Sequence, residues 1–130
     1  MINRVSGEAS FFKELSPWEN LCFSARLYGA SQDLRSRVEG LCKELNLPID
    51  ALDRPLKQLS RGQQQKVAII RSLLSNPRML LMDEPTTGLD PHSKRDVQRI
   101  VRRLHASGEV TVVLCTHDRG EAEALCDRIL

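Results

Sequence analysis

Two stretches of this sequence, roughly twenty positions apart, carry residues that suit nucleotide chemistry. Leu-Ser-Arg-Gly-Gln occupies residues 59–63, and the apolar run at 79–82 leads directly into Asp83 and Glu84. A hydroxyl, free backbone N–H groups and the positive end of a helix suit an anionic phosphate. Two carboxylates after a buried strand suit a magnesium–nucleotide complex, one for the Mg²⁺ shell and one to orient or deprotonate water. The spacing predicts ATP chemistry that is shared between two chains.

Further candidates follow at the expected carboxyl edge of the same sheet. Gly88 allows a tight turn, Asp90 precedes Pro91 as a helix cap, and His117 follows a second apolar strand, where it could hydrogen-bond a terminal phosphate. Each residue also has an ordinary interpretation. Acids end strands because they are poor strand formers, capping accounts for Asp90, and a lone histidine after a strand is often structural or exposed. No single residue decides between the two interpretations.

Composition limits the function classes. The 130 residues suit one modest domain, and a net charge of +2 does not favour nucleic acid as a partner. The four cysteines lie in or beside apolar segments without metal-ligand spacing, so we expect buried, reduced thiols. Neither a signal peptide nor an apolar run of membrane-spanning length is visible, so a membrane role would come through a partner.

Periodicity and breakers predict the elements that position these residues. Helices are expected from a capping box at Ser16 and Glu19 to a stop at Gly29, over 34–45, from about Gly62 to Asn76-Pro77, over 90–108 and over 119–125. Strands are expected at 79–83, at 110–115 and, cut off by the chain end, at 128–130. The first sixty residues are expected to be helical only. The alternation in the second half predicts an α/β fold with a parallel sheet that has lost its first strands and has an uncovered edge.

Four segments, taken in order and spacing, resemble the nucleotide-binding domain of ATP-binding cassette (ABC) transporters. They are the signature segment at 59–63, the Walker B strand at 79–84, the D-loop at 88–90 and the switch histidine at 116–118. The resemblance implies a fragment of a P-loop NTPase-like ABC ATPase. Residues 1–76 would be a Q-loop remnant and the helical signature subdomain, and residues 77–130 a partial RecA-like sheet core flanked by helices.

The resemblance also implies a role for each site residue, with ATP and Mg²⁺ as cofactors. In the signature segment, Ser60, Gly62 and Gln63 would contact the γ-phosphate of ATP held by the opposite subunit. Arg61 stands where glycine is commoner, and an arginine near phosphates is electrostatically compatible. The remaining roles would be the Mg²⁺ acid for Asp83, the general base for Glu84, the γ-phosphate sensor for His117, the D-loop acid for Asp90, and the place of a Mg²⁺-contacting glutamine for Glu8.

The family works in assemblies, so the resemblance implies partners. They are a second nucleotide-binding subunit and an integral membrane transporter subunit, which would hold the chain on the cytoplasmic, inner face of the cell membrane. Residues 11–29 most resemble exporter ATPases, which implies export. Phe11, Phe12 and Trp18 are candidates for contact with the membrane subunit, or plain core aromatics.

One family feature is not found in these residues. No G-x-x-x-x-G-K-[ST] phosphate-binding loop occurs in the sequence, and by the resemblance it would lie before Met1. We therefore expect a truncated ATPase subunit that binds ATP weakly by itself, because unscreened acids repel a polyphosphate. Two alternatives are a non-catalytic module that supplies only the signature segment to a partner's ATP, and a soluble ABC ATPase that does not transport.

Overall fold

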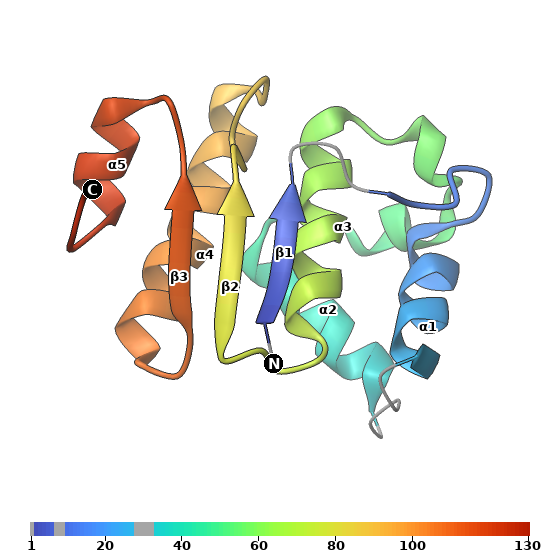
Figure 1. The fold of residues 1–130 in the computed structure, drawn as a ribbon. Helices are drawn as coiled ribbons and strands as arrows, with labels where there is room; N and C mark the ends of the chain where they lie inside the picture. The colour runs from blue at the N-terminus through green and yellow to red at the C-terminus, as the bar shows by residue number, and fades with distance from the viewer. Residues whose placement is uncertain (1, 7–9, 28–32) are drawn as a thin grey trace.

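A three-stranded parallel sheet organises the chain in the computed structural model, which describes residues 2–6, 10–27 and 33–130 (Figure 1). The strands are β1 (Ile2–Ser6), β2 (Met79–Asp83) and β3 (Thr111–Cys115), in the spatial order β1-β2-β3. Their register pairs Ile2 with Met79 and Met79 with Thr111, so the three carboxyl ends meet at one edge. Ligands of open α/β sheets bind at this edge.

Strand β1 corrects the expectation that the first sixty residues are helical only. Its hydrogen-bonding partner β2 lies more than seventy residues later, and among residues 2–5 the side chain buried in the core is that of Val5. A strand of five residues is too short to leave a clear periodic signal, so the sequence prediction was wrong here. Strand β1 belongs to the same sheet as β2 and β3 although it lies within residues 1–76. The division into residues 1–76 and 77–130 stays a prediction.

The strand expected at 128–130 is also wrong. These residues follow α5 without strand structure, and Ile129 and Leu130 are exposed. A strand needs a neighbour that satisfies its backbone groups. Strand β3 is therefore the edge of the described sheet, and β2 is the central strand.

The described residues form five helices, and their predicted positions are confirmed to within a few residues. They are α1 (Pro17–Leu27), α2 (Leu34–Glu44), α3 (Arg61–Leu73), α4 (Pro91–Ser107) and α5 (Arg119–Leu125). Two short 3₁₀ helices, η1 (Ile49–Asp53) and η2 (Leu56–Gln58), fill the link between α2 and α3. The predicted capping box of α1 forms, with Ser16 and Glu19 bonded reciprocally at 3.1 Å. The predicted stop at Gly29 lies outside the described residues.

The hydrophobic core lies between one face of the sheet and helices α3 and α4, which run behind the strands in Figure 1. Val5, Leu80 and Met82 point into it from β1 and β2, and all three are at most 2% exposed. Helix α3 is buried along most of its length because α1 and α2 pack against its other sides. This burial fixes α3, and with it the start of the helix at Ser60, against the sheet.

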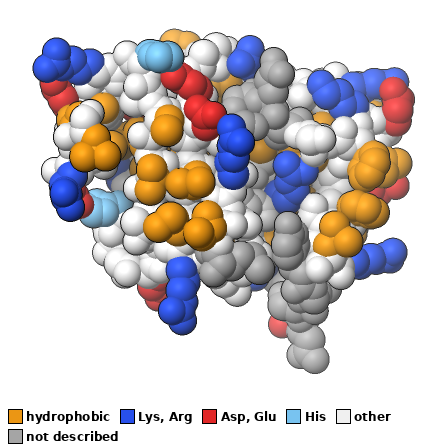
Figure 2. Space-filling view, in the orientation of Figure 1, with side chains coloured by type: hydrophobic (Ala, Val, Ile, Leu, Met, Phe, Trp, Pro, Cys, Tyr) orange, Lys and Arg blue, Asp and Glu red, His pale blue; other side chains and the backbone are white. Residues whose placement is uncertain are grey.

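The opposite face of the sheet is open. Ile2 is 63% and Val113 40% exposed, and Cys115 is exposed as well, contrary to the expectation of buried thiols. Figure 2 shows hydrophobic side chains gathered on this face, over the strands. Of the four thiols Cys42 is fully buried, and burial raises its pKa to about 11. Parallel sheets are normally covered on both faces, so this exposed apolar face favours contact with another protein molecule.

We therefore expect the 130-residue chain to self-associate in solution. The open face and the unpaired edge of β3 together offer apolar contact and backbone hydrogen bonds to a second molecule. Light scattering at increasing protein concentration would show a rising mean mass. A monodisperse monomer with a cooperative melting transition would contradict this expectation.

Candidate nucleotide site

The carboxyl edge of the sheet brings Glu84 and His117 into contact. Glu84 directly follows β2, and its N–H donates to the carbonyl of Cys115 at 2.8 Å. One carboxylate oxygen of Glu84 lies 3.3 Å from Nε2 of His117, and the other accepts a hydrogen bond from the Thr87 hydroxyl at 2.7 Å. His117 is almost completely exposed, whereas Glu84 is mostly covered. A carboxylate and an imidazole are thus held together, facing solvent, at the position where ligands bind.

The backbone of Glu84 takes a left-handed conformation, with φ of 49°. Such a conformation costs a non-glycine residue on the order of 1–3 kcal/mol and persists only where the surroundings enforce it. Strained residues of this kind cluster at functional sites. No sequence pattern revealed this conformation.

Asp83, the predicted Mg²⁺ acid, forms an ion pair with Arg4 at 3.0 Å. Both side chains remain substantially exposed. Arg4 belongs to β1, which the sequence did not predict, so this partner was missed. Mg²⁺ is usually held by one or two carboxylates together with phosphate oxygens and water, and Asp83 suits that role if the guanidinium moves toward the phosphates.

The remaining metal prediction, Glu8, lies outside the described residues. Within residues 2–6, 10–27 and 33–130, no group of three or more histidine, cysteine or acidic side chains is arranged to hold a metal ion. A purely protein-made metal cage is thus not seen in this part of the chain. A magnesium ion that shares its ligands with a nucleotide needs no such cage.

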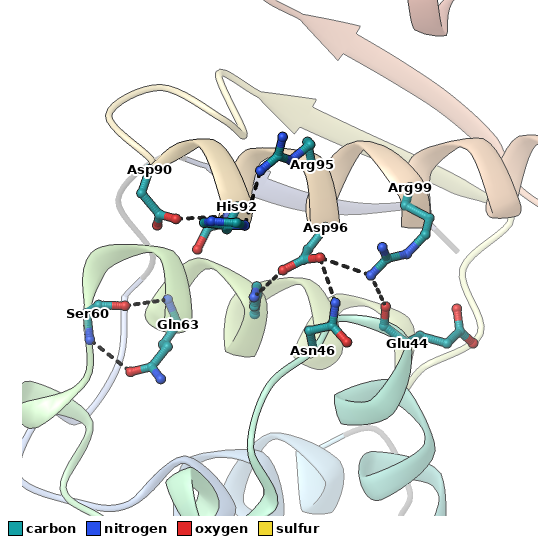
Figure 3. Close-up of polar contacts among 11 residues, drawn as sticks. Glu44, Asn46, Ser60, Gln63, Asp90, His92, Arg95, Asp96 and Arg99 are labelled. Carbon is teal, nitrogen blue, oxygen red and sulfur yellow. Dashed lines mark hydrogen bonds and ion pairs between the residues drawn. The ribbon is translucent and has the colours of Figure 1, made fainter.

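Helix α3 begins with a reciprocal capping box at Ser60 and Gln63 (Figure 3). The Ser60 hydroxyl oxygen accepts the N–H of Gln63, and the Gln63 side chain accepts the N–H of Ser60, both at 3.1 Å. The other first-turn amides, those of Arg61 and Gly62, have no partner within the helix. Ser60 and Arg61 are exposed. The helix start therefore presents the Ser60 hydroxyl hydrogen, the Arg61 side chain and the positive helix end to the outside, whereas Gly62, which was predicted to contact the phosphate, is buried.

The start of α3 packs directly against the turn at 88–90 and the start of α4. A Cβ atom on Gly62 would collide with the Ser93 side chain, and one on Gly88 would lie 3.0 Å from the Arg61 guanidinium carbon. Gly88 has φ of 76°, which confirms the predicted tight turn. Asp90 caps α4 as predicted, since it accepts the N–H of Ser93 at 3.1 Å. Hydrogen bonds from Ser93 lower the pKa of Asp90, so it stays ionised.

This close approach predicts that Gly62→Ala destabilises the fold. The added methyl group would push the starts of α3 and α4 apart, at a cost of about 1–3 kcal/mol in the free energy of unfolding. Gly40→Ala is the matched control, because Gly40 is an exposed residue of α2 with open space around it. That change is expected to stabilise by about 0.5–1 kcal/mol. Urea unfolding of both variants checks the pair, and equal effects would contradict the packing argument.

A second link joins α3 to the residues after Glu84. The Gln65 side-chain amide donates to the carbonyl of Pro85 at 3.0 Å, and both residues are buried. The start of α3 and the Glu84–His117 pair therefore belong to one packed unit. Gln65 was not among the predicted site residues. A polar residue on the apolar face of a helix was the one signal that could have indicated it.

A buried ionic network joins α3 to α4 beyond the start of α3 (Figure 3). Asp96 of α4, 7% exposed, binds Nζ of Lys66 at 2.8 Å, the Asn46 side chain at 2.9 Å and Arg99 at 2.9 Å. Burial alone would raise the pKa of Asp96, but the hydrogen bonds from Lys66 and Asn46 outweigh it and leave this pKa below its ordinary value. The network ties α3 and α4 to the end of α2.

Comparison with known proteins gives consistent matches. The sequence profile of the family described as "ABC transporter" matches residues 1–87. The spermidine/putrescine import ATP-binding protein PotA of Legionella pneumophila (strain Paris) is 36% identical over 130 residues, which are 99% of this chain and 35% of that protein. The ABC transporter ATP-binding protein NatA of Bacillus subtilis (strain 168) is 34% identical over 125 residues, 95% of this chain and 50% of that protein.

A third relative has a name that points to export. The Nod factor export ATP-binding protein I of Ralstonia nicotianae is 41% identical over 112 residues, which are 85% of this chain and 34% of that protein. The chain thus spans about a third to a half of the length of these curated relatives. No helix among the described residues is long and apolar enough to cross a membrane.

Proposed function

Because this chain belongs to the ABC transporter family of ATP-binding proteins, we propose that it is part of a subunit that binds and hydrolyses ATP in a pair with a second nucleotide-binding subunit. The observation that carries the proposal is the contact between Glu84 and His117 at the carboxyl edge of the sheet. It joins a candidate base to a candidate phosphate sensor where the fold class binds its ligands.

At this chain's own site, three residues would act on one nucleotide. Asp83 would hold the Mg²⁺ shell, and Mg²⁺ neutralises developing charge on the phosphates when it is bound. Glu84 would take the proton of the attacking water, with the Thr87 hydroxyl and His117 fixing the direction of its two oxygens. Exposed His117 would donate a hydrogen bond toward the terminal phosphate.

The start of α3 would serve the nucleotide of the partner. Ser60 and Arg61 are exposed, and the capping box fixes the hydroxyl oxygen while its hydrogen is available to a phosphate. The Arg61 side chain adds positive charge there, and it lies against Gly88 of the turn that precedes Asp90. Movement at a bound phosphate would therefore reach the turn that carries Asp90 through the approach of Arg61 to Gly88, which suits the proposed communication role of Asp90.

We also propose a membrane transporter subunit as partner, which would hold the chain on the cytoplasmic, inner face of the membrane. Phe12 is 53% and Phe23 49% exposed, and their rings meet edge to face with centroids 5.2 Å apart. Phe11 stacks with Arg71 and Trp18 with Arg35, so these two aromatics are partly covered by this chain itself. Of the three predicted contact residues, Phe12 is the one that best suits docking.

Export is our proposed direction of transport. It rests on the likeness of residues 11–29 to exporter ATPases, and the name of the Ralstonia nicotianae relative agrees with it. Most of the relatives compared, PotA among them, have names that point to import. Direction therefore needs transport measurements on an assembled complex, with substrate counted on each side of a vesicle.

The first test uses a chimera. A family segment that ends in a G-x-x-x-x-G-K-[ST] loop and its helix is joined ahead of residue 1, and Mg-ATP hydrolysis is measured. We expect the chimera to hydrolyse ATP, because the added segment supplies the phosphate-binding loop that residues 1–130 do not contain. A folded chimera that binds ATP without hydrolysing it would contradict the proposed hydrolytic role.

The 130-residue chain is the matching control. Its acids alone would repel a polyphosphate, so we expect weak binding or none in an equilibrium titration with Mg-ATP. A micromolar affinity would overturn this expectation.

One observation favours a second candidate function, that of a non-catalytic module. Arg4 forms an ion pair with the predicted Mg²⁺ acid, Asp83, whereas the capping box at the start of α3 is formed and Ser60 and Arg61 are exposed there. Such a module would stimulate a loop-containing relative when the two are mixed. Ser60→Arg would abolish the stimulation and Glu84→Gln would leave it unchanged, and stimulation that depends on Glu84 would exclude the module.

A further inference from the structure

A buried carboxylate lies beside the proposed site and has no role in the chemistry described so far. Glu121, in the first turn of α5, is only 4% exposed. Its Oε1 accepts hydrogen bonds from the Thr86 hydroxyl at 2.7 Å and from the Gln98 amide at 3.2 Å, and its Oε2 accepts one from the Thr116 hydroxyl at 2.9 Å. Burying a carboxylate is costly unless its oxygens are bonded, and here three donors from three elements meet them.

Two of these donors lie next to Glu84 and His117 in the sequence. Thr86 is two residues after Glu84, and Thr116 directly precedes His117. Hydrogen bonds of the backbone N–H groups connect the donors to the rest of each loop. The carbonyls of Glu84 and Thr86 accept the N–H groups of Thr87 and Leu89, and the Thr116 hydroxyl oxygen accepts the N–H of Asp118 at 3.0 Å.

The third donor and the helix cap close the arrangement. Gln98 brings in α4, while Asp118 caps α5 by accepting the N–H of Glu121 itself at 3.0 Å. Glu121 therefore joins the loop after β2, the loop after β3 and helix α4 through one side chain. An apolar residue would fill the same space but would give no direction to either loop, whereas a fully satisfied polar network specifies one arrangement.

We propose that Glu121 is a positioning residue that fixes Glu84 and His117, which follow the paired strands β2 and β3, relative to one another. The left-handed backbone of Glu84 supports this, because a strained conformation persists only where its neighbours over-determine it. The catalytic meaning of the arrangement rests on the proposed function. The tie between the two loops does not, and it is testable in the chain itself.

Hydrogen exchange measured by mass spectrometry tests the tie. In Glu121→Gln, an amide replaces an oxygen that accepts a hydrogen bond, so peptides covering 84–89 and 116–121 should exchange faster, on the order of tenfold, while α2 and α3 stay unchanged. Glu123→Gln is the matched control on the same helix, because Glu123 is exposed and paired only with Arg119 among the contacts described. Unchanged loops, or acceleration throughout the molecule, would overturn the proposal.

Two further variants keep the test decisive if Glu121→Gln does not fold. Thr86→Val should loosen mainly 84–89, and Thr116→Val should loosen mainly 116–121, because each removes one hydroxyl and leaves the other bonded. No change in either loop in these isosteric variants would contradict a tie through Glu121.

Kinetics of the chimera separate positioning from simple stabilisation. Glu121→Gln should lower kcat by about tenfold and leave KM for ATP unchanged, because the added loop would still bind the phosphates while the base is misaligned. An unchanged kcat, or a change in KM alone, would refute a role in alignment. If the parent chimera does not hydrolyse ATP, the proposed function fails, and the exchange pattern still decides whether Glu121 ties the two loops.

Discussion

Glu84→Gln is expected to reduce ATP hydrolysis by the chimera about 10²–10⁴-fold, the range that general base catalysis contributes. Glutamine keeps the shape of the side chain and its contact distance to the Thr87 hydroxyl, but it cannot take a proton from water. ATP binding should persist or strengthen, because a negative charge beside the phosphates is removed. The measurements are phosphate release at saturating Mg-ATP and a separate nucleotide titration.

Glu109→Gln is the control for this effect. Glu109 is an exposed acid that precedes β3, at the opposite end of the strand from His117. Its replacement removes the same charge from the chain and should leave hydrolysis unchanged. If Glu84→Gln retained hydrolysis close to that of the parent chimera, Glu84 would not be the base.

The second large effect is expected in stability. Lys66→Met removes the buried cation of Asp96 and leaves it with Arg99, whose side chain is half exposed. Breaking a buried pair typically costs about 3–5 kcal/mol, and we expect a loss toward the lower end of this range because Arg99 still compensates part of the charge. Lys57→Met is the matched control, because Lys57 pairs with Glu14 at the surface, and an exposed pair contributes about 1 kcal/mol or less. Urea unfolding gives both values. A loss in Lys66→Met no larger than that in the control would show that the network does not hold α3 to α4.

A double variant distinguishes a stranded charge from a lost contact. Lys66→Met combined with Asp96→Leu removes both charges, and it should recover much of the stability because well-packed apolar side chains can replace a buried ion pair. Failure to recover would indicate that Asn46 and Arg99, which also bind Asp96, carry the network.

The same pair predicts a dependence on pH. The pKa of Asp96 lies below its ordinary value, so the ionised form stabilises the fold above the ordinary carboxyl pKa of about 3.9. That stabilisation is lost as pH falls through the lowered pKa. As the pH falls below about 5, the free energy of unfolding of the parent chain should decrease more than that of the double variant. Parallel pH profiles would contradict this assignment.

The sequence predicted well what depends on local chemistry. Helix α4 begins at the cap expected from Asp90 and ends at Gly108 in the left-handed conformation that glycine adopts readily, and α3 begins within two residues of the start expected at about Gly62. The sequence also predicted that Glu84 and His117 lie at the same edge of the sheet. Each residue follows an apolar run that forms a strand, and parallel strands have their carboxyl ends at one edge. The assigned roles of these residues remain predictions.

What the sequence did not reveal depends on partners distant in the chain. Strand β1 is short and is defined by its pairing with β2, so both the strand and the ion pair of Arg4 with Asp83 were missed. Glu121 resembles an ordinary acid in the first turn of a helix, and its three donors become visible only when the loops after β2 and β3 meet. Long-range register, rather than local propensity, sets these features.

Mixing two inactive chimeras tests most directly whether the start of α3 serves a nucleotide held by another chain. Ser60→Arg and Glu84→Gln should each be inactive alone. If Ser60 of one chain and Glu84 of the other complete the same site, a mixed dimer has one intact site, and random pairing should restore about a quarter of the parent hydrolysis. No restoration, in mixtures shown by mass to contain the mixed dimer, would contradict the shared site.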